Sequence, residues 1–464
     1  MAEITKNSRI SFRIRDVSID GSGIGVCEEN GMTVFCFGAH RGETVTGTVI
    51  KKAASYLVAR SDNKTVSDCC PVYPMCGGCS LLHFPYEKTL EIKAGHVKDC
   101  LERIGGLKNA NIEPIIPSPM ITAYRNKAIY RFAEGKNGPG CGFFRRNSHD
   151  VIVSESCFCE KPMLRKICGE LLEILNGHRF TVYDEKTGKG LLRALMIRVS
   201  TDEKAMVCVS VNAKELPEAL NIAGELMKRL PAVVSFYTHS NTSKTNTIFE
   251  GAFTLAAGEK TLTDHIGDAV FEIAPESFFQ VNPYATVKLY DKAFEYALEG
   301  ENSPVSLLDI YCGIGTIGIY FAKKAKNVMI SNIFGVDYTD AAISEAAKAV
   351  NANGISANCR YVAGDAGKVL SAYAGLDGET VSIIRNADVA VVDPPRKGLD
   401  DRIPGIIDSL LLKKVVYVSC NPATLARDIV KFRELGFELS KVTPVDMFPF
   451  EGHIEVVALL QRPE

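Results

Sequence analysis

Four segments between residues 307 and 460 carry residues that could do chemistry. The first is Leu307-Leu-Asp-Ile-Tyr-Cys-Gly-Ile-Gly-Thr-Ile-Gly318, in which an apolar run enters a glycine-rich turn. Glycines let the backbone approach a ligand, and the helix after the turn offers unpaired N–H groups at its N-terminus. Asp337 closes the next apolar run, where a carboxylate can accept hydrogen bonds from ribose hydroxyls. The pattern predicts a nucleotide-type cofactor and suits a nicotinamide and S-adenosylmethionine equally well.

The second segment, Val389-Ala-Val-Val-Asp393-Pro-Pro-Arg-Lys-Gly398, puts an acid and two prolines directly after an apolar run. The run predicts a buried strand. Ligands of doubly wound α/β sheets bind beyond the carboxyl ends of the strands, so Asp393 is expected at the mouth of the cofactor crevice. The two prolines restrict the backbone that leaves the strand and so fix the position of the next residues.

The third segment, Val415-Val-Tyr-Val-Ser-Cys-Asn-Pro-Ala-Thr-Leu-Ala-Arg-Asp428, brings a cysteine to the end of the next strand. A helix that begins near Pro422 turns its positive end toward the sulfur of Cys420, which predicts a lowered thiol pKa. A lone cysteine is most often a small core residue. The position at the ligand end of a strand, next to Asn421 and Pro422, favours a nucleophile instead.

A carboxylate opens the last apolar run of the chain. Glu455 stands at the start of Glu455-Val-Val-Ala-Leu-Leu460, where burial costs free energy unless the group has a partner or a task. Burial also raises the pKa of a carboxyl group toward the range of a useful general base. A structural pair with a basic neighbour and a general base are equally consistent with this pattern.

One reaction needs all of these groups. Carbon 5 of uracil is a poor nucleophile because its electrons are shared with the ring carbonyls. A thiolate that adds to carbon 6 produces an enolate, whose carbon 5 can attack a sulfonium methyl group. A base must then remove the hydrogen from carbon 5 so that the thiolate can leave. A methyl-donor crevice, Cys420 and Glu455 would together provide that chemistry.

The elements that must position these residues are predicted by the apolar pattern. From about residue 270, strands alternate with helices, which is typical of a parallel α/β domain. The expected strands are 305–311, 333–337, 389–393, 415–419 and 455–460, and the expected helices include 340–351 and 423–435. Residues 121–250 also mix the two, with strands expected at 129–132, 195–199, 205–211 and 233–238. The first 60 residues suggest a small β-barrel, with strands at 9–14, 33–37 and 43–49 and a glycine-rich break at 20–25.

Composition sets wider limits. The chain has 464 residues, enough for two to four domains at roughly 150 residues each. Its 53 Lys and Arg nearly balance its 55 Asp and Glu, so the global charge gives no sign of a polyanionic partner. No apolar run approaches the ~18 residues that span a bilayer, and the start of the chain lacks a secretory signal pattern. We expect a cytoplasmic protein without a membrane partner.

One stretch is locally basic and aromatic. Its residues could contact phosphates and stack on bases, and they would equally suit a solvated strand face. They are Arg125, Lys127, Arg131, Arg145 and Arg146, interleaved with Tyr124, Tyr130, Phe143 and Phe144.

The chain also holds 15 cysteines. In a reducing compartment such thiols more often bind metals, act as nucleophiles or fill cores than form disulfides. The densest stretch is Cys69-Cys-Pro-Val-Tyr-Pro-Met-Cys-Gly-Gly-Cys79. Its spacing favours metal ligation over a set of buried core thiols.

Together these segments resemble the RNA uracil-5-methyltransferase family, S-adenosylmethionine-dependent enzymes that act on transfer or ribosomal RNA. The match covers nearly the whole chain. Residues 419–428 are similar to the nucleophile signature of the family, and Gly452-His-Ile-Glu455 is similar to its closing signature. The resemblance implies that Cys420 is the nucleophile and Glu455 the general base.

The resemblance also implies the residues that bind the methyl donor. The segment Pro275-Glu-Ser-Phe-Phe-Gln-Val-Asn282 resembles the entry to the catalytic domain. The implied donor-binding residues are Gln280, Tyr311, Asp337 and Asp393, with Asp365 as a weaker match. Two positions depart from the family: Glu451 stands where members often carry Thr, and Thr316 stands where several carry Asn.

The cysteine stretch resembles the ribosomal RNA branch of the family. Cys70-x5-Cys76-x2-Cys79, completed by Cys157, is similar to the four ligands of a [4Fe–4S] cluster. Its expected role is structural or RNA-positioning, because methyl transfer needs no redox step. Four thiolates would also suit tetrahedral zinc, and spacing alone does not distinguish the two. Cys69 and Cys159 are neighbours that lie outside the family spacing.

The resemblance implies an α/β fold in three parts. A TRAM-like, OB-like RNA-binding β-barrel is expected over 1–62, a mixed α/β iron–sulfur and RNA-binding domain over 63–268, and a Rossmann-like methyltransferase domain over 269–464. A helix over about 88–104 is expected to pack with the catalytic domain. The basic, aromatic stretch then becomes a candidate RNA face, and the target uracil must be turned out of its stack to reach Cys420.

The expected activity is therefore methylation of carbon 5 of a specific uridine, in 23S ribosomal RNA, by a monomer. A transfer RNA substrate is the first alternative. An iron–sulfur, nicotinamide-dependent oxidoreductase would leave Cys420 and Glu455 without a task. Intact Asp393, Cys420 and Glu455 argue against an RNA-binding module with a degenerate fold, and the Ser-Cys-Asn-Pro context favours uracil over cytosine.

Overall fold

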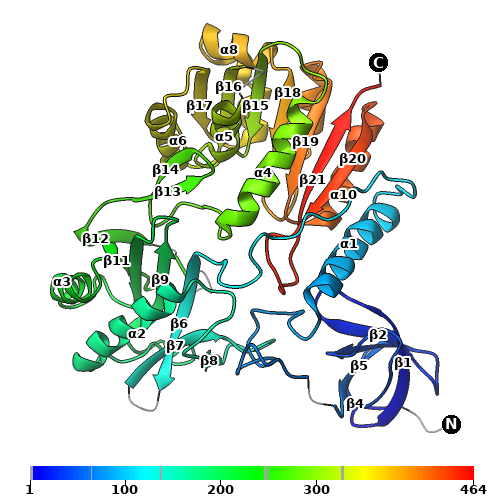
Figure 1. Ribbon diagram of the computed structural model, residues 1–464, viewed down its shortest axis with the longest axis vertical. Coiled ribbons are helices and arrows are strands. Elements are labelled where there is room, and N and C mark those ends of the chain that lie inside the picture. The colour runs from blue at the N-terminus through cyan, green and yellow to red at the C-terminus, as the bar shows by residue number, and fades with distance from the viewer. Residues whose placement is uncertain are drawn as a thin grey trace.

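The computed structural model describes residues 4–63, 65–135, 138–244, 248–249, 251–325 and 329–463. They form three sheet-based units (Figure 1): a barrel near the N-terminus, a central unit, and a larger unit that contains the C-terminus. Among the described helices, none combines the length and apolar character that crossing a bilayer requires.

The N-terminal unit is a closed barrel. Its strands, in the order β1-β2-β3-β5-β4, are β1 (Arg9–Val17), β2 (Ser22–Cys27), β3 (Thr33–Phe37), β4 (Thr44–Lys52) and β5 (Tyr56–Ser61). The segment expected as a glycine-rich break is mostly strand β2, so that expectation is wrong. A Cβ on Gly23 or Gly25 would come within 2.8 Å of a backbone carbonyl oxygen, so glycine here permits close strand packing.

The central unit is a seven-stranded sheet with two helices packed on it. Its order is β12-β11-β10-β9-β6-β7-β8. The strands are β6 (Lys127–Gly135), β7 (Gly138–Phe144), β8 (Val151–Val153), β9 (Leu192–Val199), β10 (Ala205–Val211), β11 (Val233–Ser240) and β12 (Ala252–Gly258). The helices α2 (Pro162–Gly177) and α3 (Ala219–Arg229) share one apolar core with the sheet.

The C-terminal unit is a seven-stranded sheet in the order β17-β16-β15-β18-β19-β21-β20. Its strands are β15 (Val305–Ile310), β16 (Ile330–Asp337), β17 (Asn358–Ala363), β18 (Val389–Val392), β19 (Lys414–Ser419), β20 (Glu438–Val445) and β21 (Glu455–Gln461). Strands β15 to β19 are parallel, and β21 runs antiparallel to both of its neighbours. The chain order reverses between β15 and β18, which is where such sheets bind ligands.

Helices cover both faces of this sheet. Leu307 and Leu308, adjacent on β15, belong to separate apolar cores, so each face has its own. The helices are α4 (Pro283–Leu298), α5 (Thr316–Lys324), α6 (Asp340–Ala352), α7 (Ala366–Ser371), α8 (Gly378–Arg385), α9 (Ile403–Ser409) and α10 (Pro422–Glu434). This is the α/β class expected for the C-terminal part of the chain.

Two elements link the units. The hairpin of β13 (Leu262–Ile266) and β14 (Ala269–Ile273) shares a core with α4, and it crosses the domain boundary expected at residue 268. We therefore propose a boundary before Leu262. Helix α1 (Tyr86–Arg103) comes from the N-terminal half but lies beside α10 (Figure 1), with Val97 and Leu101 in the core of the C-terminal unit.

Candidate active site

Three of the predicted site residues meet at one edge of the C-terminal sheet. Asp393 and Cys420 come directly after the parallel neighbours β18 and β19, so they leave the sheet on the same side. Glu455 begins β21, which runs antiparallel to β19 with Ser419 opposite Val456. Cys420 and Glu455 are therefore neighbours across that edge, as the sequence predicted.

The two carboxyl groups at this edge are held in unusual protonation states. Glu455 is 5% exposed, and burial, reinforced by the negative charge of Asp393, raises its pKa well above the ordinary value. Burial, followed by the charge of Asp309, raises the pKa of Asp393 to about 7. Arg396 opposes the shift at Glu455. The expectation of a raised pKa at Glu455 is confirmed.

The thiol of Cys420 differs from its expectation. Burial, and then the charges of Glu455 and Asp393, raise the pKa of the thiol to about 11, while Arg396 lowers it. Asn421 caps α10 by accepting a hydrogen bond from the Ala423 N–H at 3.1 Å. The predicted lowering by the helix end is wrong for the protein alone, because desolvation and two carboxylates outweigh it.

Helix α10 fixes the loop that carries Asp393 and Arg396. The side-chain amide of Asn421 donates to the Arg396 carbonyl oxygen at 3.0 Å, and Arg427 donates to the Lys397 carbonyl oxygen at 2.9 Å. Asp428 is fully buried and accepts a hydrogen bond from the Leu399 N–H at 2.9 Å. The polar residues of the cysteine segment therefore hold the neighbouring loop in place.

The glycine-rich turn after β15 has an open helix end. Tyr311 is a non-glycine residue with φ +66°, a strained conformation that clusters at functional sites. Gly315 caps α5 with no side-chain acceptor, which leaves N–H groups available to a ligand. Asp337 accepts a hydrogen bond from the Gly313 N–H at 3.0 Å, so it shapes this turn. The Tyr311 hydroxyl accepts from the Asp400 N–H at 3.2 Å.

The other predicted or suspected donor-binding positions have structural contacts of their own. Gln280 is buried on the segment that enters α4, where its carbonyl oxygen accepts from Asn126 at 3.5 Å. Asp365 caps α7 and forms an ion pair with Arg402 at 2.7 Å, so its carboxylate is engaged. The Thr316 hydroxyl lies 2.9 Å from the hydroxyl of Tyr290.

Two residues of the site were not selected from the sequence. Asp309 lies within β15 and is 1% exposed. The Gly318 N–H donates to one carboxylate oxygen at 3.1 Å, and the other oxygen has no hydrogen-bond partner among the residues that the structure describes. Burial raises its pKa to about 7. A charged residue within an apolar run was the signal used for Glu455, and it could have found Asp309. Arg396 stood in the quoted motif, but its effect on the thiol is visible only in three dimensions.

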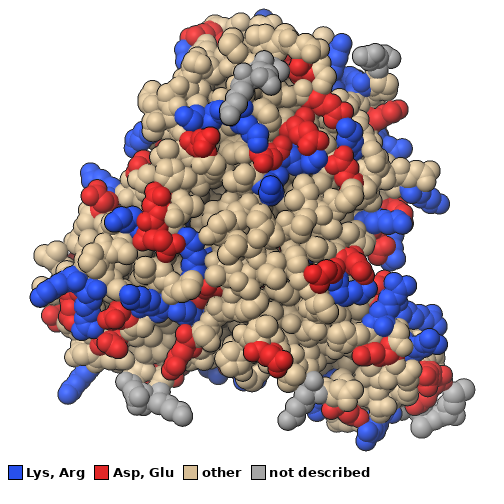
Figure 2. All heavy atoms as spheres, in the orientation of Figure 1, with Lys and Arg blue, Asp and Glu red and all other residues tan. Residues whose placement is uncertain are grey.

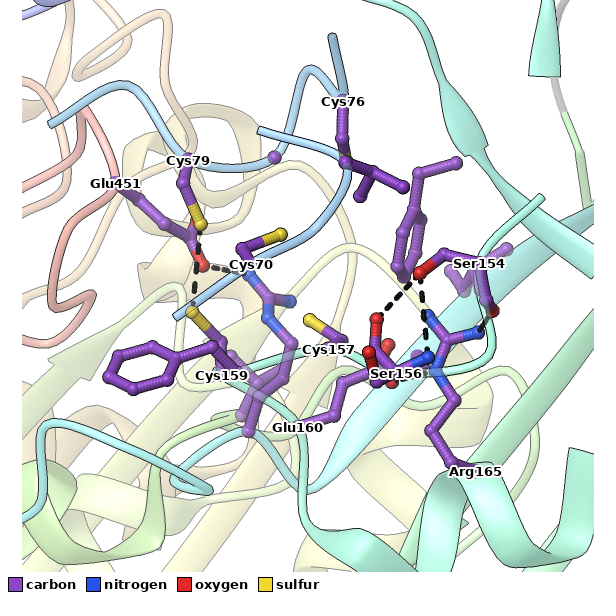
Figure 3. A pocket seen from close by; sticks show the side chains of 18 of the residues that line it. Cys70, Cys76, Cys79, Ser154, Ser156, Cys157, Cys159, Glu160, Arg165 and Glu451 are labelled. Carbon is purple, nitrogen blue, oxygen red and sulfur yellow. Dashed lines mark hydrogen bonds and ion pairs between the residues drawn. The ribbon is translucent and has the colours of Figure 1, made fainter. Parts of the chain in front are cut away.

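A second candidate site is the pocket where the cysteines gather. The four predicted ligands Cys70, Cys76, Cys79 and Cys157 line one cavity of about 400 Å³, and Cys159 lines it as well (Figure 3). The sulfur atoms of Cys79 and Cys159 lie 3.6 Å apart. Within the described ranges, no three metal-ligating side chains are arranged to hold an ion. The donor set itself, at least four thiols around one cavity, suits an iron–sulfur cluster or zinc.

The basic, aromatic stretch lies largely inside the protein. Tyr124 and Tyr130 are fully buried, and Arg125 and Lys127 line the cysteine pocket rather than an open face. Of its five basic residues, Arg145 alone is exposed. Strand β6 has neighbours on both edges, one of its faces is buried, and Arg131 on the half-buried face stacks on Phe144. Charges of both signs are interspersed on the side drawn in Figure 2, around a centre with few charged residues.

Comparison with known proteins agrees with this architecture. Residues 257–463 match the model of the tRNA (uracil-5-)-methyltransferase family. An uncharacterized RNA methyltransferase of Bacillus cereus is 36% identical over 469 residues, which is 99% of this chain and 98% of the relative. A Listeria monocytogenes protein of the same description is 38% identical, covering 98% of each chain.

A solved structure extends the match to three dimensions. The tRNA (uracil-54, C5)-methyltransferase of Pyrococcus abyssi, in complex with S-adenosyl-L-homocysteine, superimposes with a TM-score of 0.74 at 26% identity. The match covers 97% of this chain and 99% of that one, so it includes all three units. The chain therefore belongs to the RNA (uracil-5-)-methyltransferase family and is an S-adenosylmethionine-dependent RNA methyltransferase.

Proposed function

We propose that the protein methylates carbon 5 of a uridine in ribosomal RNA, as a cytoplasmic monomer, with Cys420 as nucleophile and Glu455 as general base. The observation that supports this most is the meeting of one thiol, the buried carboxyl group of Glu455 and the half-buried carboxyl group of Asp393 at a single sheet edge. Methylation of an oxygen or nitrogen atom would leave the thiol without a task.

In the proposed reaction, the sulfur of Cys420 bonds to carbon 6 of the uracil and carbon 5 takes the methyl group. Glu455 then takes the proton from carbon 5, the carbon–sulfur bond breaks, and the thiolate is restored. S-adenosylmethionine supplies the methyl group as an electrophile and becomes S-adenosylhomocysteine. Because burial raises the pKa of Glu455, this group in its ionised form is a stronger base than an exposed carboxylate.

The nucleophile must be ionised before it can add to the ring. A pKa of about 11 leaves the Cys420 thiol protonated near neutral pH, so positive charge beside the sulfur favours the reactive form. Arg396 is the cationic residue that lowers this pKa, and α10 directs its N-terminus toward the same place.

We propose that Gln280, Tyr311, Asp337 and Asp393 hold the methyl donor. The uncapped N-terminus of α5 and the positive φ angles of Tyr311 and Gly313 support a ligand at this turn. The reversal of strand order between β15 and β18 supports a donor site next to the proposed nucleophile, because ligands of such sheets bind where the order reverses.

We also propose that Cys70, Cys76, Cys79 and Cys157 hold a [4Fe–4S] cluster with a structural role. Their shared cavity supports this, since it brings all four thiols to one place. Arg125 and Arg165 on its wall are paired with Glu451 and Glu160. Iron and sulfide analysis of anaerobically purified protein tests the proposal. Stoichiometric zinc instead would contradict it.

Transfer RNA is a second candidate substrate, which one observation favours. The Pyrococcus abyssi enzyme, described as acting on tRNA uracil-54, matches 97% of this chain. The barrel and the central unit are therefore not enough to separate the two RNA classes. Mapping 5-methyluridine in both RNAs of a strain that lacks the protein decides between them. Loss from ribosomal RNA supports the first proposal, loss from transfer RNA alone supports the second, and no loss contradicts both.

A further inference from the structure

The proposed base is flanked by a long loop. Strands β20 and β21 form a hairpin in which Val445 pairs with Glu455, so the connecting residues 446–454 begin and end beside Glu455. We call these residues the base loop. In Figure 1 the base loop, coloured red, runs down from the C-terminal sheet toward the place where the three units meet.

Four consecutive carbonyl groups of the base loop accept hydrogen bonds from other parts of the chain. The donors come from the segment before α4, from α1, from the start of the central unit, and from the residues after Cys79. The pairs are Asn282 Nδ2 to Met447 O (2.9 Å), Lys93 Nζ to Phe448 O (2.7 Å), Tyr124 Oη to Pro449 O (3.1 Å), and Ser80 N and Leu81 N to Phe450 O (3.0 and 2.9 Å).

Charged side chains of the base loop are fixed as well. Asp446 forms an ion pair with Lys93 at 2.6 Å, and neither side chain is exposed. Glu451 accepts hydrogen bonds from Arg125 at 2.8 Å and from the Tyr124 hydroxyl at 2.9 Å. Between them, Phe450 is held at φ +63°, a conformation that persists in a non-glycine residue only when its surroundings enforce it.

Glu451 belongs to the cysteine pocket and to the base loop at the same time. Its side chain lines the pocket beside Cys79 and Cys159 (Figure 3), while three residues separate it from Glu455. A movement of the Glu451 carboxylate would therefore displace Glu455 through the short piece of backbone between them.

We propose that Tyr124 and Arg125 are positioning residues, which hold Glu455 in place for proton removal through Glu451 and the base loop. The proposal rests on the proposed role of Glu455. It makes the central unit, and not only the C-terminal sheet, a determinant of the step that releases the product. Neither residue touches the reacting atoms; each acts on the loop.

The test uses Tyr124→Phe, because Tyr124 is fully buried and the change removes only a hydroxyl. Two substrates separate the steps. RNA with 5-fluorouridine is trapped as an adduct without any proton removal from carbon 5, whereas RNA with ordinary uridine must lose that proton to be released. We expect wild-type trapping of the first and release of the second slowed about three- to tenfold, the effect of losing one ordinary hydrogen bond. The adduct should accumulate as a shifted band on a denaturing gel.

Tyr130→Phe is the matched control. Tyr130 is equally buried, lies on β6 close to Tyr124 in the chain, and donates its hydroxyl hydrogen to Glu160 at 3.0 Å instead of to the base loop. It should release product at the wild-type rate. A second variant, Glu451→Gln, keeps an acceptor for Tyr124 but removes the charge that pairs with Arg125. It should also slow product release without changing the trapping of RNA with 5-fluorouridine.

Two kinds of outcome would overturn the inference, and a third would overturn the proposed function instead. Wild-type release in both Tyr124→Phe and Glu451→Gln would show that the contacts do not position the base. An equal loss of trapping and release, or an equal effect of Tyr130→Phe, would show a general effect on folding. Failure of the wild-type enzyme to be trapped, or normal release by Glu455→Gln, would instead contradict the proposed function on which the inference rests.

Discussion

The edge around Cys420 and the pocket around Cys79 both contain thiols, but the neighbours of those thiols differ. At the edge, one thiol lies among carboxyl groups, and Glu455 and Asp393 raise its pKa. In the pocket, five thiols lie together, and the wall carries Arg125 and Arg165, paired with Glu451 and Glu160, as well as Lys127. A single thiol beside a base suits covalent chemistry, whereas several thiols around one cavity suit a metal group. In the functions proposed above, the same residue type serves two purposes because the number and kind of its neighbours differ.

The largest expected effect comes from removing the single thiol. Cys420→Ala should reduce methyl transfer by at least about a thousandfold, because the reaction has no other nucleophile to raise the reactivity of carbon 5. Binding of S-adenosylmethionine, measured by calorimetry, should stay at the wild-type affinity. Substantial remaining transfer would refute the assignment of Cys420 and, with it, the contrast between the two regions.

Removing the proposed base should slow a later step. Glu455→Gln should reduce product release by about 10²- to 10⁴-fold, the usual contribution of a general base, while the thiol still adds to the ring. A covalent adduct with ordinary RNA should then accumulate on a denaturing gel. Trapping of RNA with 5-fluorouridine, which needs no proton removal, provides the control and should be unchanged. Normal turnover without an adduct would mean that Glu455 has only a structural role.

A change in the cysteine pocket should affect the metal more than the chemistry. Cys79→Ser should lower the iron content of anaerobically purified protein to less than about half, because the cluster loses one of its proposed ligands. Trapping by Cys420 should persist. Cys69→Ser and Cys159→Ser are the matched controls: the first thiol is exposed, the second lines the same cavity, and neither is a proposed ligand. If Cys159→Ser loses iron and Cys157→Ser does not, then Cys159 and not Cys157 is the fourth ligand.

Long apolar runs made most of the fold predictable. The expected strands at 33–37 and 205–211 match β3 and β10 residue for residue. The expected helix 340–351 ends one residue before α6 does, and the expected helix 423–435 is shifted by one residue from α10. Strand β17 was missed because Asn358–Ala363 is half-buried throughout and begins with polar and charged residues, so it lacks the continuous apolar run of the central strands. The β13–β14 hairpin was missed although Gly267 and Asp268 form the kind of two-residue turn that marks a hairpin.

The site could be predicted only where it depends on strand ends. Asp393, Cys420 and Glu455 each adjoin an apolar run, so sheet topology alone brings them together. The balance of charge on Cys420 depends on distances between those side chains, and the sequence led to the wrong sign. The contacts that anchor the base loop could not be predicted from the sequence either, because residues such as Lys93 and Asp446 are 353 positions apart in the chain. Local patterns predict elements, but contacts of this range come from packing.

The smallest expected effect comes from removing the positive charge of Arg396, which lies near the Cys420 thiol. Arg396 lowers the pKa of Cys420, but the arginine is exposed, so water and salt screen its charge. Arg396→Gln should raise the thiol pKa further and slow trapping of 5-fluorouridine RNA about threefold near neutral pH, where the thiolate fraction falls tenfold for each unit of pKa. The difference should shrink with added salt and as the pH approaches about 11, because the thiol then ionises without help. Lys397→Gln removes the same charge one residue away and should leave the rate unchanged; equal slowing by both variants would assign the effect to RNA binding instead of to the thiol.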